Sequence, residues 1–203
     1  MYVKSNPLAK PQPNFHMLLG GENQNSLALK HYGAVIIDWG RTLHDPELDS
    51  LMPGALRTVK TLSRFYRIGV VSLAGSEPAE QRRLKIERSG LSPFLQAIRV
   101  GPVEKGTLFA ALCRALKVRP SECIVVDDRV SRGVRWGKQH GAKTVWSRSG
   151  KFAFELPRDH NEEPDFIVTA IEQLVPLLVV DHLDREGDFC GKSHQTDSDS
   201  VAI

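Results

Sequence analysis

Several side chains with chemical potential follow short apolar runs in this 203-residue chain. Asp38, Ser72 and the pair Asp127-Asp128 each end such a run, and Lys105 stands at the predicted start of a helix. A carboxylate can attack phosphorus covalently, and a hydroxyl and an ammonium can hold phosphoryl oxygens. Two carboxylates can also bind Mg²⁺, which prefers oxygen ligands. A single aspartate at such a place is more often a turn residue or a helix cap, but the recurrence of the pattern favours a phosphate site.

The apolar runs predict a mainly parallel sheet, because they are short, continuous and separated by helical patterns. The predicted strands cover residues 33–38, 67–72, 97–100, 123–126 and 142–146, and a short edge strand and a closing helix lie within 165–178. The fold class is therefore predicted to be α/β. Because the carboxyl ends of parallel strands share one edge of the sheet, the polar groups are expected to meet in one crevice.

The intervening segments predict helices. The first begins at Pro53, since proline suits the first helical position, and Leu56, Val59 and Leu62 are expected to face the core. The others cover about 77–88, begin at Lys105, and cover about 131–139. The cations Arg129, Arg132, Arg135 and Lys138 are interpreted as a solvated helix face.

Composition divides the chain into one domain and two tails. Residues 1–30 are rich in Pro, Gly and Asn and are predicted to be a flexible extension, residues 31–180 to form the α/β domain, and residues 181–203 to be a polar, disordered tail. The single domain is long enough to bury a proper core.

Charge, cysteine content and hydropathy give further indications of the class of protein. A net charge of +3 without a long basic block gives no indication of nucleic-acid binding. Three widely spaced cysteines indicate small buried side chains in a reducing compartment, not a disulfide framework. No signal peptide is visible, and the longest apolar stretch, 167–180, is interrupted by polar residues and a proline. A cytoplasmic protein without a membrane segment is predicted.

Four segments in order resemble the motifs of the haloacid dehalogenase superfamily. Asp38 with Thr42-Leu43 resembles the first motif, and Ser72 after Val70-Val71 resembles the second. Lys105 resembles the third, and Asp127-Asp128, with Gly141 and a strand following, resembles the fourth. The resemblance covers roughly residues 33–179. It implies a Rossmann-like, three-layer α/β sandwich and a Mg²⁺-dependent hydrolase.

The resemblance also assigns roles to individual residues. Asp38 would be the nucleophile that forms an aspartyl phosphate, with Ser72 and Lys105 completing the catalytic set. Thr42 would contact the substrate. Arg41 stands where the family usually has glycine, but the predicted topology places it beside the crevice, where it either binds the substrate phosphate or fills space in the turn. Mg²⁺ would be held by Asp38, by the backbone carbonyl of Gly40, and by Asp128 or Asp127, of which Asp128 fits the spacing better.

The first motif departs from the family pattern at two positions. The phosphatases usually carry a second aspartate, a general acid and base, where this chain has Gly40, and a glycine where it has Arg41. Glycine cannot transfer a proton, and general acid–base catalysis is typically worth about 10²–10⁴-fold in rate. His44 and Asp45 are the nearest alternatives in sequence. The fourth motif also lacks an acid, with Arg132 or Gly133 in its place.

Three functional hypotheses remain open. The first is a phosphohydrolase acting on a phosphorylated small molecule or macromolecule. The second is a degenerate member that binds phosphate or metal, turns over little and acts through protein interaction. The third is cleavage of a carbon–phosphorus or carbon–halogen bond. The spacing from Asp38 to Ser72 and on to Lys105 leaves no room for a cap domain in either interval, so the site is expected to be open or covered in a homo-oligomer.

Overall fold

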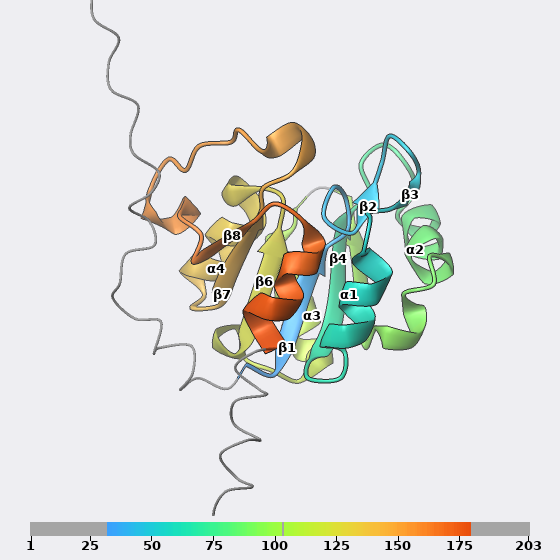
Figure 1. Cartoon of the computed structure of the whole chain (residues 1–203), viewed down its shortest axis with the longest axis horizontal. Coiled ribbons are helices and arrows are strands. Elements are labelled where there is room, and N and C mark those ends of the chain that lie inside the picture. Colours follow the sequence, from blue (N-terminus) through green and yellow to red (C-terminus); the bar gives the residue numbers. More distant parts are fainter. Residues whose placement is uncertain (1–31, 103, 180–203) are drawn as a thin grey trace, which may run out of the picture.

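One parallel sheet organises the part of the chain that the computed structural model describes, residues 32–102 and 104–179. Its strand order is β5-β4-β1-β6-β7-β8, and every neighbouring pair is parallel (Figure 1). The strands are β1 (Ala34–Asp38), β4 (Arg67–Leu73), β5 (Ala97–Gly101), β6 (Cys123–Asp127), β7 (Lys143–Ser147) and β8 (Phe166–Val168). This confirms the predicted strands to within one or two residues.

Helices cover both faces of the sheet and make the three layers that the sequence predicted. They are α1 (Ala55–Leu62), α2 (Ala79–Arg88), α3 (Gly106–Leu116), a π-helical turn (Val130–Val134) that leads into α4 (Arg135–Gln139), and a helix at 174–179. Short 3₁₀ turns cover Ser92–Phe94, Pro120–Glu122, Gly150–Phe152, His160–Glu162 and Ile171–Gln173. In Figure 1, α1 and the 174–179 helix lie in front of the sheet and α3 lies behind it.

The alternation of side chains along β1 divides the core in two. Val35 and Ile37 pack with α1 and the 174–179 helix, whereas Ala34 and Ile36 pack with α3. The strand is buried on both faces, as its continuous apolar sequence predicts. One prediction for α1 was wrong: Leu56 is 43% exposed, and Thr58 takes the buried position instead. The helix begins at Ala55, not at Pro53, and its buried face is made by Ala55, Thr58, Val59 and Leu62, which leaves Leu56 at the edge of that face.

A small hairpin that the sequence analysis did not predict lies between β1 and α1. Its strands are β2 (His44–Asp45) and β3 (Ser50–Leu51), each of two residues. Between Asp38 and Gly101, the described residues form only this hairpin, α1, β4, α2, a short 3₁₀ turn and β5. The predicted lack of a cap domain is therefore confirmed for both intervals in this stretch.

Three of the four cations interpreted as a solvated helix face make ion pairs with the segment between β7 and β8. Arg129 pairs with Glu155 at 3.0 Å, Arg135 with Glu162 at 2.8 Å and Lys138 with Asp165 at 3.0 Å, whereas Arg132 is exposed. These contacts hold a long irregular segment against the domain. In Figure 1 this segment crosses the top of the molecule, where the strands end.

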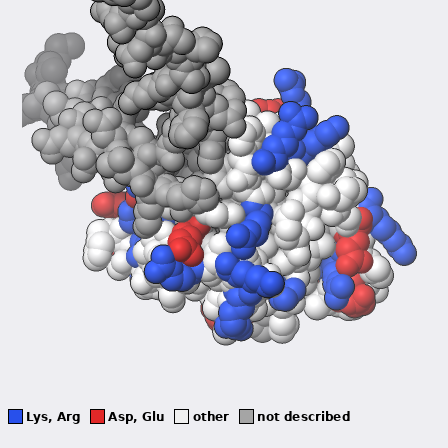
Figure 2. Space-filling view, turned by 90° about the horizontal axis from the view of Figure 1, so that it is seen from below, with Lys and Arg blue, Asp and Glu red and all other residues white. Residues whose placement is uncertain are grey.

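The opposite face, at the amino ends of the strands, carries a band of Lys and Arg side chains with acidic groups beside it (Figure 2). No helix within residues 32–102 and 104–179 is long and apolar enough to cross a membrane. Cys113 and Cys123 are buried free thiols, as predicted. Cys190, the extension 1–30 and the tail 181–203 lie outside the described residues, so the predictions made for them are untested.

Candidate active site

A buried lysine joins two carboxylates at the carboxyl edge of the sheet. The Nζ atom of Lys105 lies 2.5 Å from Oδ1 of Asp38 and 2.6 Å from Oδ2 of Asp127. Asp38 ends β1 and Asp127 ends β6, which pair directly through Ile37 and Val126. By strand alternation both carboxylates face α3, and Lys105 caps the amino end of that helix. Residues far apart in sequence thus meet as predicted.

Asp128 adds a third carboxylate to the cluster. Oxygen atoms of Asp38, Asp127 and Asp128 all lie within 4.8 Å of one another, and all three residues are buried. The sequence left open whether Asp127 or Asp128 belongs to the site, and the structure brings both to it. With every group ionised, three carboxylates and one ammonium leave a net charge of −2.

The burial of these charged groups shifts their pKa values. Burial raises the pKa of Asp38 to about 6 against the opposing pull of Lys105, and repulsion by Asp127 adds to the rise. Burial together with repulsion from Asp38 and Asp127 raises the pKa of Asp128 to about 8. Burial disfavours the charged form of Lys105, but attraction by Asp127 and Asp38 outweighs it and raises the pKa of the ammonium. The cluster therefore holds more negative charge than its lysine can balance.

These residues fit a divalent cation. Three convergent carboxylates supply the hard oxygen ligands that Mg²⁺ prefers, and the surplus charge of −2 is the charge that such an ion neutralises. A metal at this place would also return Asp38 and Asp128 to their ionised forms, since a nearby positive charge favours the carboxylate. Gly40, the predicted carbonyl ligand, lies in the turn directly after β1.

The turn after β1 places one of the two predicted substrate contacts beside Asp38. The hydroxyl of Thr42 donates to Oδ2 of Asp38 at 3.3 Å and is buried. Arg41 instead donates to Glu47 at 2.6 Å. Its φ of 63° is left-handed, which costs a non-glycine residue about 1–2 kcal/mol. Arg41 therefore adopts a backbone conformation that glycine would adopt at no such cost.

Ser72 lies in the neighbouring strand but is not joined to the lysine bridge. Its hydroxyl donates to the Leu73 carbonyl at 3.0 Å, and the side chain is buried. The strand β4 continues to Leu73, one residue beyond the predicted end, and Asp38 pairs with Val71. Ser72 thus lies one residue beyond Val71, the pairing partner of Asp38.

The two residues suggested as replacement proton donors belong to the hairpin. His44 stacks on Trp39 and its Nε2 lies 3.2 Å from Oδ1 of Asp49. Asp45 accepts hydrogen bonds from the backbone N–H groups of Glu47 and Leu48. Neither set of contacts directs a side chain toward Asp38, so the hypothesis gains no support. Position 40 itself is open: a Cβ there would meet no atom within 4 Å.

Gly133 has a structural role that the sequence analysis missed. A Cβ at this position would lie 2.4 Å from the Cβ of Asp127, closer than any real contact allows. The π-helical turn therefore packs directly over the Asp127 side chain, and only glycine permits that approach. Gly133 is one of the two positions at which the fourth motif could lack its acid, and the Asp127 side chain leaves room there only for glycine.

A comparison with protein families shows to which family this chain belongs. A model of the haloacid dehalogenase-like hydrolase family matches residues 18–141. The chain belongs to this family. The match includes every residue of the lysine bridge and the third carboxylate, and it begins within the segment predicted to be an extension.

Curated relatives in this family include phosphatases. The glyceraldehyde 3-phosphate phosphatase of Pyrococcus furiosus is 31% identical over 133 residues, which cover 63% of this chain and 54% of that protein. The N-acylneuraminate-9-phosphatase of Mus musculus is 28% identical over 106 residues, which cover 49% of this chain and 41% of that protein. The chain thus spans about half the length, or less, of these relatives.

Solved structures of similar size share the fold. A protein of Listeria monocytogenes serotype 4b aligns with a TM-score of 0.59 at 17% identity, covering 75% of this chain and 99% of that one. The D,D-heptose 1,7-bisphosphate phosphatase of Burkholderia thailandensis aligns with a TM-score of 0.54 at 17% identity, covering 79% and 99%. The domain therefore contains nearly the whole of both neighbouring folds.

The packing of Gly133 predicts a cost for a single added methyl group. Gly133→Ala should lower the free energy of unfolding by about 1–3 kcal/mol, because the new Cβ overlaps Asp127. Gly40→Ala is the matched control and should change it by less, since its Cβ enters open space. Urea denaturation of both variants measures the difference. Equal stability of the two would show that the turn over Asp127 can shift freely.

The raised pKa values predict an unusual pH dependence of the metal-free protein. Folded Asp128 keeps its proton up to about pH 8, whereas its ordinary pKa is 3.8. The unfolding free energy should therefore fall as pH rises between these values, by up to about 1.4 kcal/mol per pH unit for this group. Thermal unfolding in EDTA should show this fall, and millimolar Mg²⁺ should reduce it because the ion binds the ionised carboxylates of the folded form and so lowers the pKa of Asp128 there.

The control for this experiment is Asp128→Asn, which removes the titrating group without changing its shape. This variant should show a flatter dependence of stability on pH in EDTA than the unmodified chain. An identical slope in the two proteins would contradict the assignment of the raised pKa to Asp128.

Proposed function

We propose that this protein is a Mg²⁺-dependent phosphohydrolase that uses Asp38 as its nucleophile. The observation that carries the proposal is the bridge of Lys105 between Asp38 and Asp127, with Asp128 beside it. A carboxylate is held at a strand end next to an ammonium and two further carboxylates. That is an arrangement for attacking phosphorus while balancing the charge of an anionic substrate.

The substrate class is proposed from the relatives. Their names specify phosphate esters of small hydroxylated molecules, glyceraldehyde 3-phosphate and N-acylneuraminate 9-phosphate. We therefore place a small phosphate monoester ahead of a macromolecular substrate. The lack of a cap domain in the described residues is compatible with either class of substrate.

The proposed reaction has two displacements. In the first, an Asp38 oxygen attacks phosphorus, the bond from phosphorus to the leaving oxygen breaks, and the alcohol leaves. In the second, water attacks the aspartyl phosphate, which releases inorganic phosphate and restores the carboxylate. Lys105 balances charge near Asp38 throughout, and Thr42 orients the carboxylate through its hydrogen bond. Mg²⁺, held by the aspartates, would neutralise the charge between nucleophile and substrate.

Gly40 sets a limit on this chemistry. With no carboxyl group at position 40, the departing alkoxide must take its proton from water or from the substrate. Rates should therefore depend steeply on the acidity of the leaving group, which favours acyl and aryl phosphates over alkyl phosphates.

Removal of the nucleophile is the first test. Asp38→Asn should abolish Mg²⁺-dependent hydrolysis of an acyl or aryl phosphate, because an amide cannot form the covalent intermediate. Release of inorganic phosphate measures the activity. The control is Asp165→Asn, because the Asp165 carboxylate binds Lys138 and Thr144 and belongs to no part of the aspartate cluster. Full activity of the Asp38 variant would exclude the proposed mechanism.

Restoring the missing acid is the second test. Gly40→Asp should raise kcat on alkyl phosphates by about 10²-fold or more while changing aryl phosphates less, because only poor leaving groups need the proton. The open space at position 40 accommodates the side chain. Gly40→Asn has the same shape but no transferable proton, and it should give no such gain. Equal effects of the two substitutions would reject proton donation as the limiting step.

A degenerate, binding-only member is the second candidate, and Gly40 together with the hairpin positions of His44 and Asp45 favours it. A beryllium fluoride complex separates the two candidates, since it can occupy the place of the phosphoryl group on Asp38. Trapping at Asp38 with no turnover on a broad phosphate panel would select the binding protein. Turnover that Asp38→Asn abolishes would select the enzyme.

A further inference from the structure

The segment between β7 and β8, residues 148–165, contacts both turns that carry the predicted Mg²⁺ ligands. The hydroxyl of Ser149 donates to the Arg41 carbonyl at 3.4 Å, in the turn after β1. Glu155 bonds to the loop after β6, which begins with Asp128. Figure 1 shows the segment crossing the end of the sheet where both turns lie. The segment therefore joins two turns that follow adjacent strands.

The Glu155 carboxylate accepts hydrogen bonds from three consecutive residues of that loop. Its Oε2 accepts from Nε of Arg129 and from the N–H of Val130, each at 3.0 Å. Its Oε1 accepts from the Ser131 hydroxyl at 2.5 Å and from Nη2 of Arg129 at 3.2 Å. The bidentate contact with the guanidinium is the most directional pairing that a carboxylate makes. The carboxylate thus fixes both the backbone and the side chains of the loop.

The loop in turn holds two of the three clustered carboxylates. The backbone N–H of Arg129 donates to Oδ1 of Asp127 at 2.9 Å, and Oδ2 of the same carboxylate is bonded to Lys105. Asp128 lies between Asp127 and Arg129 in the chain, and its carbonyl accepts from the Trp146 indole at 3.0 Å. The positions of both carboxylates therefore depend on how Arg129 is held.

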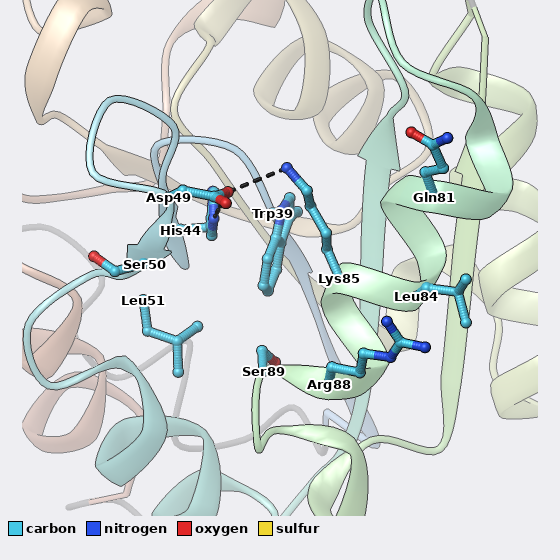
Figure 3. Close-up of a pocket in the computed structure, with 10 residues that line it drawn as sticks. All are labelled: Trp39, His44, Asp49, Ser50, Leu51, Gln81, Leu84, Lys85, Arg88 and Ser89. Carbon is cyan, nitrogen blue, oxygen red and sulfur yellow. Dashed lines mark hydrogen bonds and ion pairs between the residues drawn. The ribbon is translucent and has the colours of Figure 1, made fainter.

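Aromatic rings add further contacts to the two turns. The Arg129 guanidinium lies over the ring of Phe152, with Cζ 3.9 Å from the centroid, and Cζ of Arg41 lies 5.7 Å from the same centroid. The turn after β1 is also held by the hairpin, whose His44 stacks on Trp39 with centroids 4.7 Å apart (Figure 3). Residues outside the aspartate cluster thus hold both turns that carry its carboxylates.

We propose that Glu155 is a positioning residue for the Mg²⁺ site. Through Arg129 it holds Asp127 and Asp128 in the convergent arrangement that would bind the ion. Residues that bond to the ligands of a metal and not to the metal itself change its affinity by about 10–100-fold when they are lost. The inference rests on the Mg²⁺ site of the proposed function, and it concerns how tightly the ion is bound, not the chemical step.

Calorimetric titration of MgCl₂ into the full chain, without substrate, tests the inference. Glu155→Gln should weaken Mg²⁺ binding about tenfold, because an amide accepts only through its oxygen and its N–H groups would face other donors. Glu155→Asp keeps the charge but withdraws the carboxylate by one methylene, so it should weaken binding as well. Ser131→Ala removes one of the hydrogen bonds and should weaken binding in the same direction by less.

Asp159→Asn is the control that separates a displaced ligand from a general loss of stability. Asp159 lies in the same segment, but its carboxylate bonds to Arg135 at 2.7 Å and to the N–H of Asn161 at 2.9 Å, outside the loop after β6. This variant should bind Mg²⁺ as tightly as the unmodified chain. Thermal unfolding of every variant in EDTA measures its stability and shows that it is folded at the temperature of the titration.

Unchanged Mg²⁺ affinity in Glu155→Gln, or an equal weakening in Asp159→Asn, would overturn the inference. Unchanged affinity in Glu155→Asp alone would overturn it too, because the charge at position 155 would then act without positioning the ligands. Should Glu155→Gln fail to fold, Ser131→Ala decides, and unchanged affinity there would overturn the inference. If the unmodified chain binds no Mg²⁺, the proposed function itself fails, so the two failures are distinguishable.

Discussion

The arrangement of the carboxylates at the carboxyl edge of the sheet depends on the positive charge of Lys105. Asp38 and Asp127 end adjacent parallel strands, so their carboxylates are forced together on one face of the sheet. Without a cation between them, two buried like charges would repel strongly. The amino end of α3 supplies that cation at 2.5 and 2.6 Å. The lysine therefore couples three elements, β1, β6 and α3, into one rigid corner, yet it leaves the third carboxylate, Asp128, unbalanced.

Much of this corner is predictable from the sequence, because parallel strands have a simple geometry. Apolar runs that end in Asp38 and Asp127 must bring those residues to one edge, and Lys105 before an amphipathic helix must lie near them. The β2–β3 hairpin was not predictable, since strands of two residues carry no period to detect. Leu56 was misplaced because the buried face of α1 also includes Ala55 and Thr58, and Leu56 lies at its edge, where apolar periodicity alone does not decide burial.

The junction of Asp38 and Trp39 shows how one strand end serves two environments. Successive side chains of a strand point to opposite faces, so the carboxylate enters the charged cluster while the indole enters the core beneath the hairpin. Sequence alone does not decide between a site and a core position for a tryptophan beside a candidate nucleophile, because the choice depends on the hairpin that covers it. His44 belongs to that same unpredicted hairpin, and its stacking on Trp39 fixes the indole in place.

The substitutions in the first and fourth motifs have different physical origins. Gly133 is required by shape, since the side chain of Asp127 occupies the space that any Cβ would need. Arg41 has a left-handed backbone, which favours glycine, and a salt bridge to Glu47 holds its side chain outside the cluster. Gly40, in contrast, is neither crowded nor left-handed. The fold would accept an acid there, so its absence constrains the chemistry of the site and not the structure. If the protein is the proposed phosphohydrolase, the lack of an acid at position 40 is the feature that most narrows the range of phosphate esters it would cleave.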